Sequence, residues 1–155
     1  MTHDLVYLTC EQIDTLHDDL IEATGGLRGM LRDCSEYIAE VAPYHGENLC
    51  EVAAFYLSRI SKGHNYNDGN KRTGYFATRL FLMLNGADFN GSNIEEAVEE
   101  MSDVAAAPTM DDALGLAKRL CEKHIVTDQV RIPDYKVFKR LVIKSINMAN
   151  RLSKS

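Results

Sequence analysis

The sequence has no apolar run that approaches the roughly 20 consecutive residues needed by a membrane-spanning helix. Its first residues, Met-Thr-His-Asp-Leu, lack the basic-then-apolar order of a secretory signal peptide. The four cysteines are scattered and form no CxxC pair, so we expect reduced thiols and no disulfide framework. Together these absences predict a cytoplasmic protein without a membrane partner.

Several catalytic motifs are missing as well. Neither HExxH, the helical zinc motif, nor GxSxG, the serine nucleophile motif, occurs anywhere in the chain. The five histidines do not have the spacing typical of metal ligands. The sequence therefore shows none of the usual signs of a zinc or serine hydrolase.

An alternating strand pattern of useful length is also absent, and apolar residues instead recur at helical spacing. Thr9 with Gln12 forms a capping box at the start of the first helix, and Gly25-Gly26 would end that helix. Residues 75–84 are apolar nearly all round, as in a helix at the centre of a bundle. With 155 residues, enough for one sizeable core, we expect an all-α bundle of six to eight helices around a central apolar helix.

Capping residues and prolines mark the other expected boundaries. These are a short helix over 35–41 that stops before Pro43, a capping box at Ser92 and Glu95, a helix start at Thr109 with Asp112, and Pro133 as the first residue of the last helix. Residues 125–132 are the least helical part and are compatible with extended structure.

Charge is unevenly placed. The net charge is −6, yet residues 131–155 hold seven Lys or Arg side chains and one acidic residue, Asp134. Apolar residues recur there at helical spacing, which predicts a basic amphipathic helix after a helical domain over 1–130, packed on it or extending from it. We expect this helix to lie against the acidic body of the chain; an acidic partner, such as nucleic acid, is the alternative.

Residues 64–73 concentrate more chemistry than any other stretch, and they read His64-Asn65-Tyr66-Asn67-Asp68-Gly69-Asn70-Lys71-Arg72-Thr73. Gly63 ends one helical pattern and Asn70 begins the next, which places the intervening loop at a helix N-terminus, where backbone N–H groups bind phosphate. Lys71 and Arg72 in the first turn are unfavourable for their own helix, which favours an anionic ligand.

Two side chains in this loop suit catalysis. His64 is the group whose pKa range allows it to take a hydroxyl proton near neutral pH. Asp68 is the carboxylate that would hold Mg²⁺ against phosphates. Each element alone is more often a turn or a solvated charge; their order and spacing together favour a phosphate site. The site is not a P-loop, because five residues separate Gly63 from Gly69 and Asn70 precedes Lys71.

The string from His64 to Thr73 closely resembles the signature of the Fic/Doc (Fido) family, His-x-Phe-x-Asp/Glu/Asn-Gly/Ala-Asn-Gly/Lys-Arg. Lys71 and Thr73 resemble its death-on-curing (Doc) branch, in which Asn-Lys-Arg-Thr replaces the Asn-Gly-Arg of the Fic branch. The segments 17–33 and 81–86 are similar to the family pattern too, so the resemblance covers roughly residues 5–125. It implies an all-α Fido core.

The resemblance implies ATP and Mg²⁺ as cofactors and a protein hydroxyl as acceptor. The implied roles are general base for His64, metal or acceptor support for Asp68, phosphate positioning for Asn70, an anion nest for Gly69, a phosphate clamp for Arg72, and nucleotide or phosphate contacts for Lys62, Lys71 and Thr73. Lys71 would intrude on the Fic-type anion hole. This resembles the Doc situation, in which the nucleotide lies reversed and the γ-phosphoryl is transferred.

The sequence departs from the family pattern at three positions. Tyr66 replaces Phe, and Gly69 is Fic-like beside the Doc-like Lys71, so the donor orientation stays open. Tyr75 stands where Fic enzymes have a second Arg, which argues against ordinary AMP transfer. A self-inhibitory Ser/Thr-x-x-x-Glu-Gly/Asn motif is absent, because Ala97 follows Glu96; restraint would then come from a separate antitoxin.

The resemblance therefore implies a toxin of a toxin–antitoxin pair. It would transfer the γ-phosphoryl of ATP to a Ser/Thr hydroxyl of a translation protein, with elongation factor Tu as the target that the family suggests. AMP transfer to a protein hydroxyl is the first alternative, and a catalytically weak binding module is the second.

Overall fold

The computed structural model describes residues 4–26, 29, 35–63, 70–91 and 94–146. Its helices are α1 (Cys10–Thr24), α2 (Ser35–Val41), the 3₁₀ turn η1 (Ala42–Tyr44), α3 (Leu49–Lys62), α4 (Asn70–Leu84), α5 (Ile94–Ala106), α6 (Met110–His124), α7 (Tyr135–Phe138) and the π-helical η3 (Lys139–Ile143). Two short strands, β1 (Asp88–Phe89) and β2 (Ile125–Val126), form an antiparallel pair. The expected all-α bundle is confirmed.

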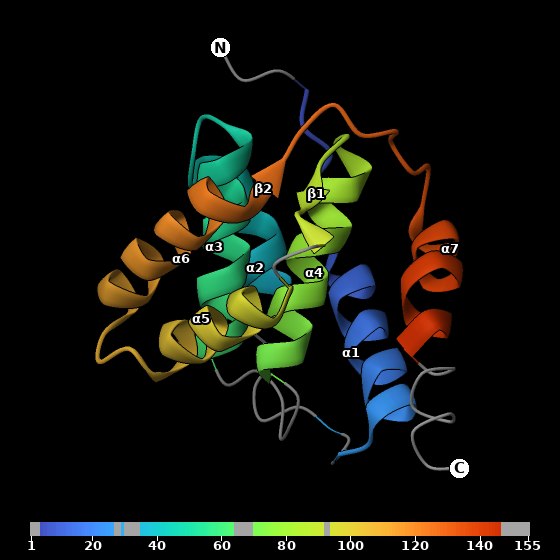
Figure 1. The fold of residues 1–155 in the computed structure, drawn as a ribbon, viewed down its shortest axis with the longest axis horizontal. Helices are drawn as coiled ribbons and strands as arrows, with labels where there is room; N and C mark the ends of the chain where they lie inside the picture. Colours follow the sequence, from blue (N-terminus) through green and yellow to red (C-terminus); the bar gives the residue numbers. More distant parts are fainter. Residues whose placement is uncertain (1–3, 27–28, 30–34, 64–69, 92–93, 147–155) are drawn as a thin grey trace.

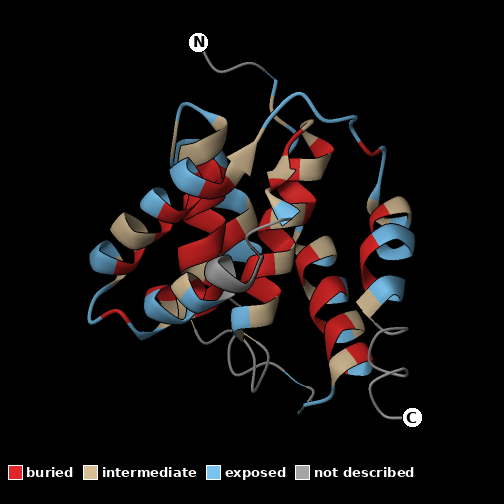
Figure 2. Ribbon diagram, viewed as in Figure 1, coloured by how far each residue is buried: buried red, intermediate tan, exposed pale blue. Residues whose placement is uncertain are grey.

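Helices α3 and α4 form the centre of this bundle. They pack against each other, with α6 and α5 on one side and α1 and α7 on the other (Figure 1). Both are buried over most of their length, whereas the outer helices expose one face (Figure 2). Among the described helices, none combines the length and apolarity needed to cross a membrane.

Aromatic side chains join the two central helices. The rings of Tyr56 on α3 and Phe81 on α4 are fully buried, with their centroids 5.1 Å apart. The Tyr56 hydroxyl accepts the backbone N–H of Leu8 at 2.9 Å, which ties the N-terminal segment to the core. Burial raises the pKa of Tyr56 because the phenolate would lose its water. The hydroxyl therefore stays neutral at all ordinary pH values.

The helix starts follow from their capping residues. Thr9 accepts the N–H of Gln12, whose side chain accepts the N–H of Thr9, so the expected capping box is present. Thr109 caps α6 through the N–H of Asp112, as expected. The expected stop before Pro43 is also confirmed, since α2 ends at Val41. The capping box at Ser92 and Glu95 lies outside the residues whose side chains are described.

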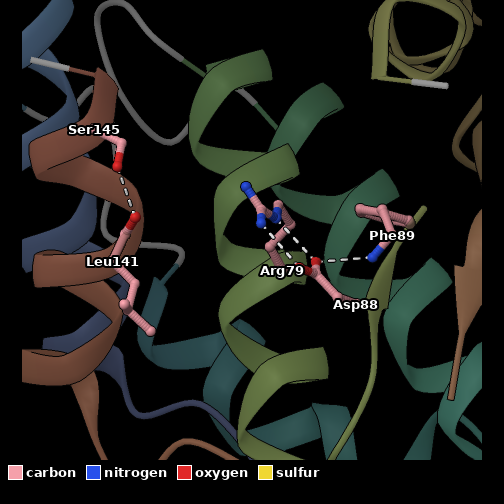
Figure 3. A network of polar contacts seen from close by, with 5 residues as sticks. All are labelled: Arg79, Asp88, Phe89, Leu141 and Ser145. Atoms are coloured by element: carbon pink, nitrogen blue, oxygen red, sulfur yellow. Dashed lines mark hydrogen bonds and ion pairs between the residues drawn. The ribbon is translucent and has the colours of Figure 1, made fainter. Parts of the chain in front are cut away.

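Extended structure after α6 is shorter than the sequence suggested. Only Ile125 and Val126 form a strand, pairing with Phe89 and Asp88. Arg79 on α4 holds this small sheet, because its guanidinium donates two hydrogen bonds of 2.9 Å to the Asp88 carboxylate (Figure 3). Asp88 in turn accepts the N–H of Phe89.

The C-terminal segment packs on the body of the protein through α1. The Tyr135 hydroxyl donates to Asp19 at 2.6 Å, and the Lys139 ammonium lies 3.3 Å from the same carboxylate. Phe138 and Val142 are buried beneath. Within the described part of this basic segment, Lys139 and Tyr135 thus meet an acidic residue of the same chain.

One expectation about this segment was wrong in detail. Pro133 is not the first helical residue, because Asp134 accepts the N–H of Val137 and caps a helix that starts at Tyr135. Beyond Phe138 this helix widens to a π-helix at Lys139–Ile143. The wider turn lets both Val142 and Ile143 face the body.

Replacing Tyr135 by phenylalanine tests this attachment. The variant keeps the ring but loses the hydrogen bond to a carboxylate, so we expect the free energy of unfolding to fall by about 1–2 kcal/mol. Urea denaturation measures the change. The control is Tyr44→Phe, at a side chain that is 87% exposed, where no measurable change is expected. Equal stability of Tyr135→Phe and Tyr44→Phe would contradict the contact.

Candidate functional site

Several helix ends meet around the start of α4. Helix α3 ends at Lys62, α4 begins at Asn70, and α1 ends beside them at Thr24, all at the same end of the bundle (Figure 1). His64, Asp68 and Gly69 lie outside the described residues, so their predicted roles as base, metal-supporting carboxylate and anion nest stay predictions. We use the term frame for the described residues around this loop, at the ends of α1 and α3 and the start of α4.

Helices α3 and α4 approach each other closely at Gly74. A Cβ atom at Gly74 would lie 2.1 Å from the Ser61 Oγ and 3.0 Å from its backbone nitrogen, so a side chain at this position does not fit. Glycine therefore lets the last turn of α3 touch the first turns of α4. This contact sets the separation between the two ends of the 64–69 loop.

Replacing Gly74 by alanine should disrupt this contact. We expect a loss of about 1–3 kcal/mol in the free energy of unfolding, because the methyl group forces α3 and α4 apart. The matched control is Gly115→Ala, in the middle of α6, where an added Cβ meets nothing within 4 Å. That variant should gain up to about 1 kcal/mol from helix propensity. Thermal and urea unfolding of both proteins measure the difference, and equal effects would contradict the close approach.

Arg72 reaches across to the end of α1. Its guanidinium donates to the Gly25 carbonyl at 2.9 Å and also to the Thr24 hydroxyl. Carbonyl groups at a helix C-terminus carry partial negative charge, so a cation is favourable there. This contact explains why Arg72 is tolerated in the first turn of its own helix. The phosphate clamp predicted for Arg72 stays a prediction.

Lys62, like Arg72, contacts a carbonyl group just beyond the end of another helix. Its ammonium donates to the carbonyl of Ala107, directly after α5. Lys71 is exposed in the first turn of α4. Lys62, Lys71 and Arg72 thus come from the two helix ends that flank the loop, and with the N-terminus of α4 they are donors of the kind a polyphosphate requires.

Thr73 lies deeper than its sequence neighbours. Its side chain has no exposed surface, and its hydroxyl makes no hydrogen bond with a described residue; the same holds for the buried Ser61 hydroxyl. Buried hydroxyls without partners cost free energy. The structure thus places Thr73 in the packed frame, and a direct contact with nucleotide stays a prediction.

Tyr75 occupies the place of the second arginine of the Fic pattern. Its side chain is only 4% exposed, and its ring stacks on Phe89 with centroids 5.2 Å apart and planes at 11°. Desolvation raises the pKa of Tyr75, so the hydroxyl stays neutral. Together with Arg79 and Asp88 it lines a pocket of about 360 Å³. No cation at position 75 is available to a phosphate group.

The described residues show no metal site of their own. Among them, no group of three or more His, Cys, Asp or Glu side chains is arranged to hold a metal ion. The predicted Mg²⁺ contact through Asp68 stays a prediction, because that residue lies outside the described ranges.

Sequence reasoning missed the partners of the basic residues. The Thr24 hydroxyl and the Ala107 carbonyl contact Arg72 and Lys62 across 48 and 45 positions of the chain. The glycine pair after Thr24 marks a helix end with exposed carbonyl groups. Nothing in the sequence, however, indicates which cation reaches them.

Comparison with known proteins agrees with this architecture. The model of the Fic/DOC family matches residues 7–82, a range that contains α1 and α3, the 64–69 loop and most of α4. The chain is also 32% identical over 124 residues to a protein of Escherichia phage P1 named protein kinase doc. That match covers 72% of this chain and 98% of the phage protein. The chain therefore belongs to the Fic/Doc family, and within it to the Doc branch.

Proposed function

We propose that this protein is a Doc-like toxin that transfers the γ-phosphoryl group of ATP to a Ser or Thr hydroxyl of a translation protein. The observation that carries the choice of reaction is the burial of Tyr75 against Phe89. A site that binds ATP for AMP transfer would use a cation there, as the Fic signature does. The similarity to the phage protein kinase doc supports the same reading.

The roles of the residues follow from their chemistry. His64 accepts the proton of the acceptor hydroxyl, whose oxygen then attacks the γ-phosphorus, and ADP leaves. Arg72, Lys71 and Lys62 offset the phosphate charge, and Asn70 with Gly69 positions the oxygens. Asp68 would hold Mg²⁺, which offsets the negative charge of the phosphates when bound.

The decisive experiment uses ATP labelled at either the α- or the γ-phosphate. The purified protein is incubated with elongation factor Tu, and in parallel with whole lysate, and label in protein is followed on gels. Kinase activity puts the γ-label, and no α-label, into the acceptor. Incorporation of the α-label alone would overturn the proposal and support AMP transfer.

The target is tested in the same experiment. Label on purified elongation factor Tu supports it as the acceptor, and mass spectrometry then gives the modified residue. If γ-label enters another lysate protein only, the reaction stands and the proposed target is wrong.

The toxin role needs a cellular readout. We expect induced expression of the chain to stop growth and protein synthesis, and co-expression of a cognate antitoxin to relieve this. We infer such a partner because the sequence carries no self-inhibitory motif. If cells grow normally while they contain soluble protein that transfers γ-label to its acceptor, the toxin role is wrong and the kinase activity stands.

A further inference from the structure

Two cysteines far apart in the sequence meet on the side of the molecule formed by α3 and α6. Cys50 lies in the first turn of α3 and Cys121 in the last turn of α6, and these two helices pack together. Lys118 and Ile125, about one helical turn before and after Cys121, line the same surface pocket as Cys50, so the two cysteines face each other where α3 packs on α6. This pair plays no part in the site at the start of α4.

The two thiols differ in accessibility. Cys50 is half-buried and lines a surface pocket of about 570 Å³ together with Glu51, Lys118 and Glu122. Cys121 is 1% exposed and does not line this pocket. A small oxidant in the pocket therefore reaches Cys50 first, and Cys121 is shielded from it.

The two thiols also differ in acidity. The hydrogen bond from Cys121 lowers the pKa of the Cys50 thiol, more than the opposing effect of burial raises it, and Lys118 acts in the same direction as the hydrogen bond. The position of Cys50 at the N-terminus of α3 also favours a thiolate. The neighbouring Cys50 thiol and burial both raise the pKa of Cys121, so Cys121 stays a protonated thiol.

We infer that Cys50 and Cys121 form a peroxide-sensitive dithiol, in which Cys50 is the reacting thiol and Cys121 resolves it to a disulfide between α3 and α6. The Cys50 thiolate attacks one oxygen of hydrogen peroxide, the O–O bond breaks, and hydroxide leaves and is protonated to water, giving a sulfenic acid. The Cys121 sulfur then attacks the Cys50 sulfur and gives up its thiol proton, the S–O bond breaks, and the hydroxyl group leaves with that proton as a second water. Two thiols are oxidised and one peroxide is reduced to two waters.

The bond would change the stability of the whole bundle. It joins the start of α3 to the end of α6, and the closed loop includes the 64–69 segment, α4 and α5. Closing so long a loop removes much conformational freedom from the unfolded chain. We expect the midpoint of thermal unfolding to rise by roughly 5–15 °C on oxidation.

The test begins with the unmodified chain. Fully reduced protein is treated with hydrogen peroxide, its remaining thiols are alkylated, and peptides are mapped without reductant. We expect one peptide that joins Cys50 to Cys121, with Cys10 alkylated, and loss of this species after dithiothreitol. Alkylation of both Cys50 and Cys121, sulfinic acid at Cys50 without a cross-link, or a link to another cysteine would overturn the inference.

Variants separate the two roles. In Cys121→Ser, a sulfenic acid should persist at Cys50 and react with dimedone, and peroxide should leave the unfolding midpoint unchanged. The matched control is Cys10→Ser, at a half-buried thiol that contacts Ser35 and Asp14, and it should retain both the cross-link and the thermal shift. A thermal shift that survives in Cys121→Ser would assign the stabilisation to another modification.

Discussion

Replacing His64 by alanine is expected to lower the rate of phosphoryl transfer by about 10²–10⁴-fold, because the acceptor hydroxyl loses its general base. The free energy of unfolding is measured alongside by urea denaturation, so that a loss of activity is referred to folded protein. Steady-state transfer of γ-label to the acceptor measures the rate, and the growth arrest should disappear in parallel.

A second histidine supplies the control. His45 is exposed before α3 and stacks on Phe55, with ring centroids 4.2 Å apart. His45→Ala should keep full activity per folded molecule, with a loss of about 0.5–1.5 kcal/mol from the ring contact. Toxicity that persists unchanged in His64→Ala would mean that it does not depend on catalysis, and it would favour the alternative of a catalytically weak binding module.

Replacing Tyr75 by arginine, the residue of the Fic pattern, is expected to destabilise the protein by about 3–5 kcal/mol, because it buries a charge without a partner. Asp88, the nearby carboxylate, already receives both hydrogen bonds from Arg79, so a second guanidinium would face a like charge. Circular dichroism during urea unfolding measures the loss, and low solubility is expected.

The matched control is Tyr75→Phe, which keeps the stack on Phe89 and should change stability by less than about 1.5 kcal/mol. If Tyr75→Arg instead folds with unchanged stability, the side chain at position 75 is not buried as described. If that variant also transfers the α-label, the residue at this position decides which phosphate reacts.

Local signals predicted much of the fold. Thr9 with Gln12 and Thr109 with Asp112 act within one helical turn, so their caps follow from the sequence alone. The central helix was predictable because nearly every residue over 75–84 is apolar. The start of the last helix was predicted at Pro133, two residues too early. Proline suits several positions near a helix start, and the capping side chain is that of Asp134.

The frame of the site was less predictable. The family signature identifies the chemical groups, but their partners come from distant parts of the chain, as the contact of Arg72 with Gly25 shows. The need for glycine at position 74 arises from Ser61 on another helix, and it has no local signal. The π-helical turn at Lys139–Ile143, which buries the adjacent residues Val142 and Ile143, likewise has no local signal in the sequence.

The contact between Arg72 and the end of α1 makes the first helix an internal competitor for an anion that binds the Nη1 group of this side chain. Both hydrogen bonds to α1 use Nη1, so a phosphate that takes the Nη1 donors does so in place of the Gly25 carbonyl and the Thr24 hydroxyl. By thermodynamic reciprocity, the anion weakens the last turn of α1 by the same free energy with which α1 lowers the affinity for the anion. A change that frays this turn would therefore tighten phosphate binding without touching the phosphate.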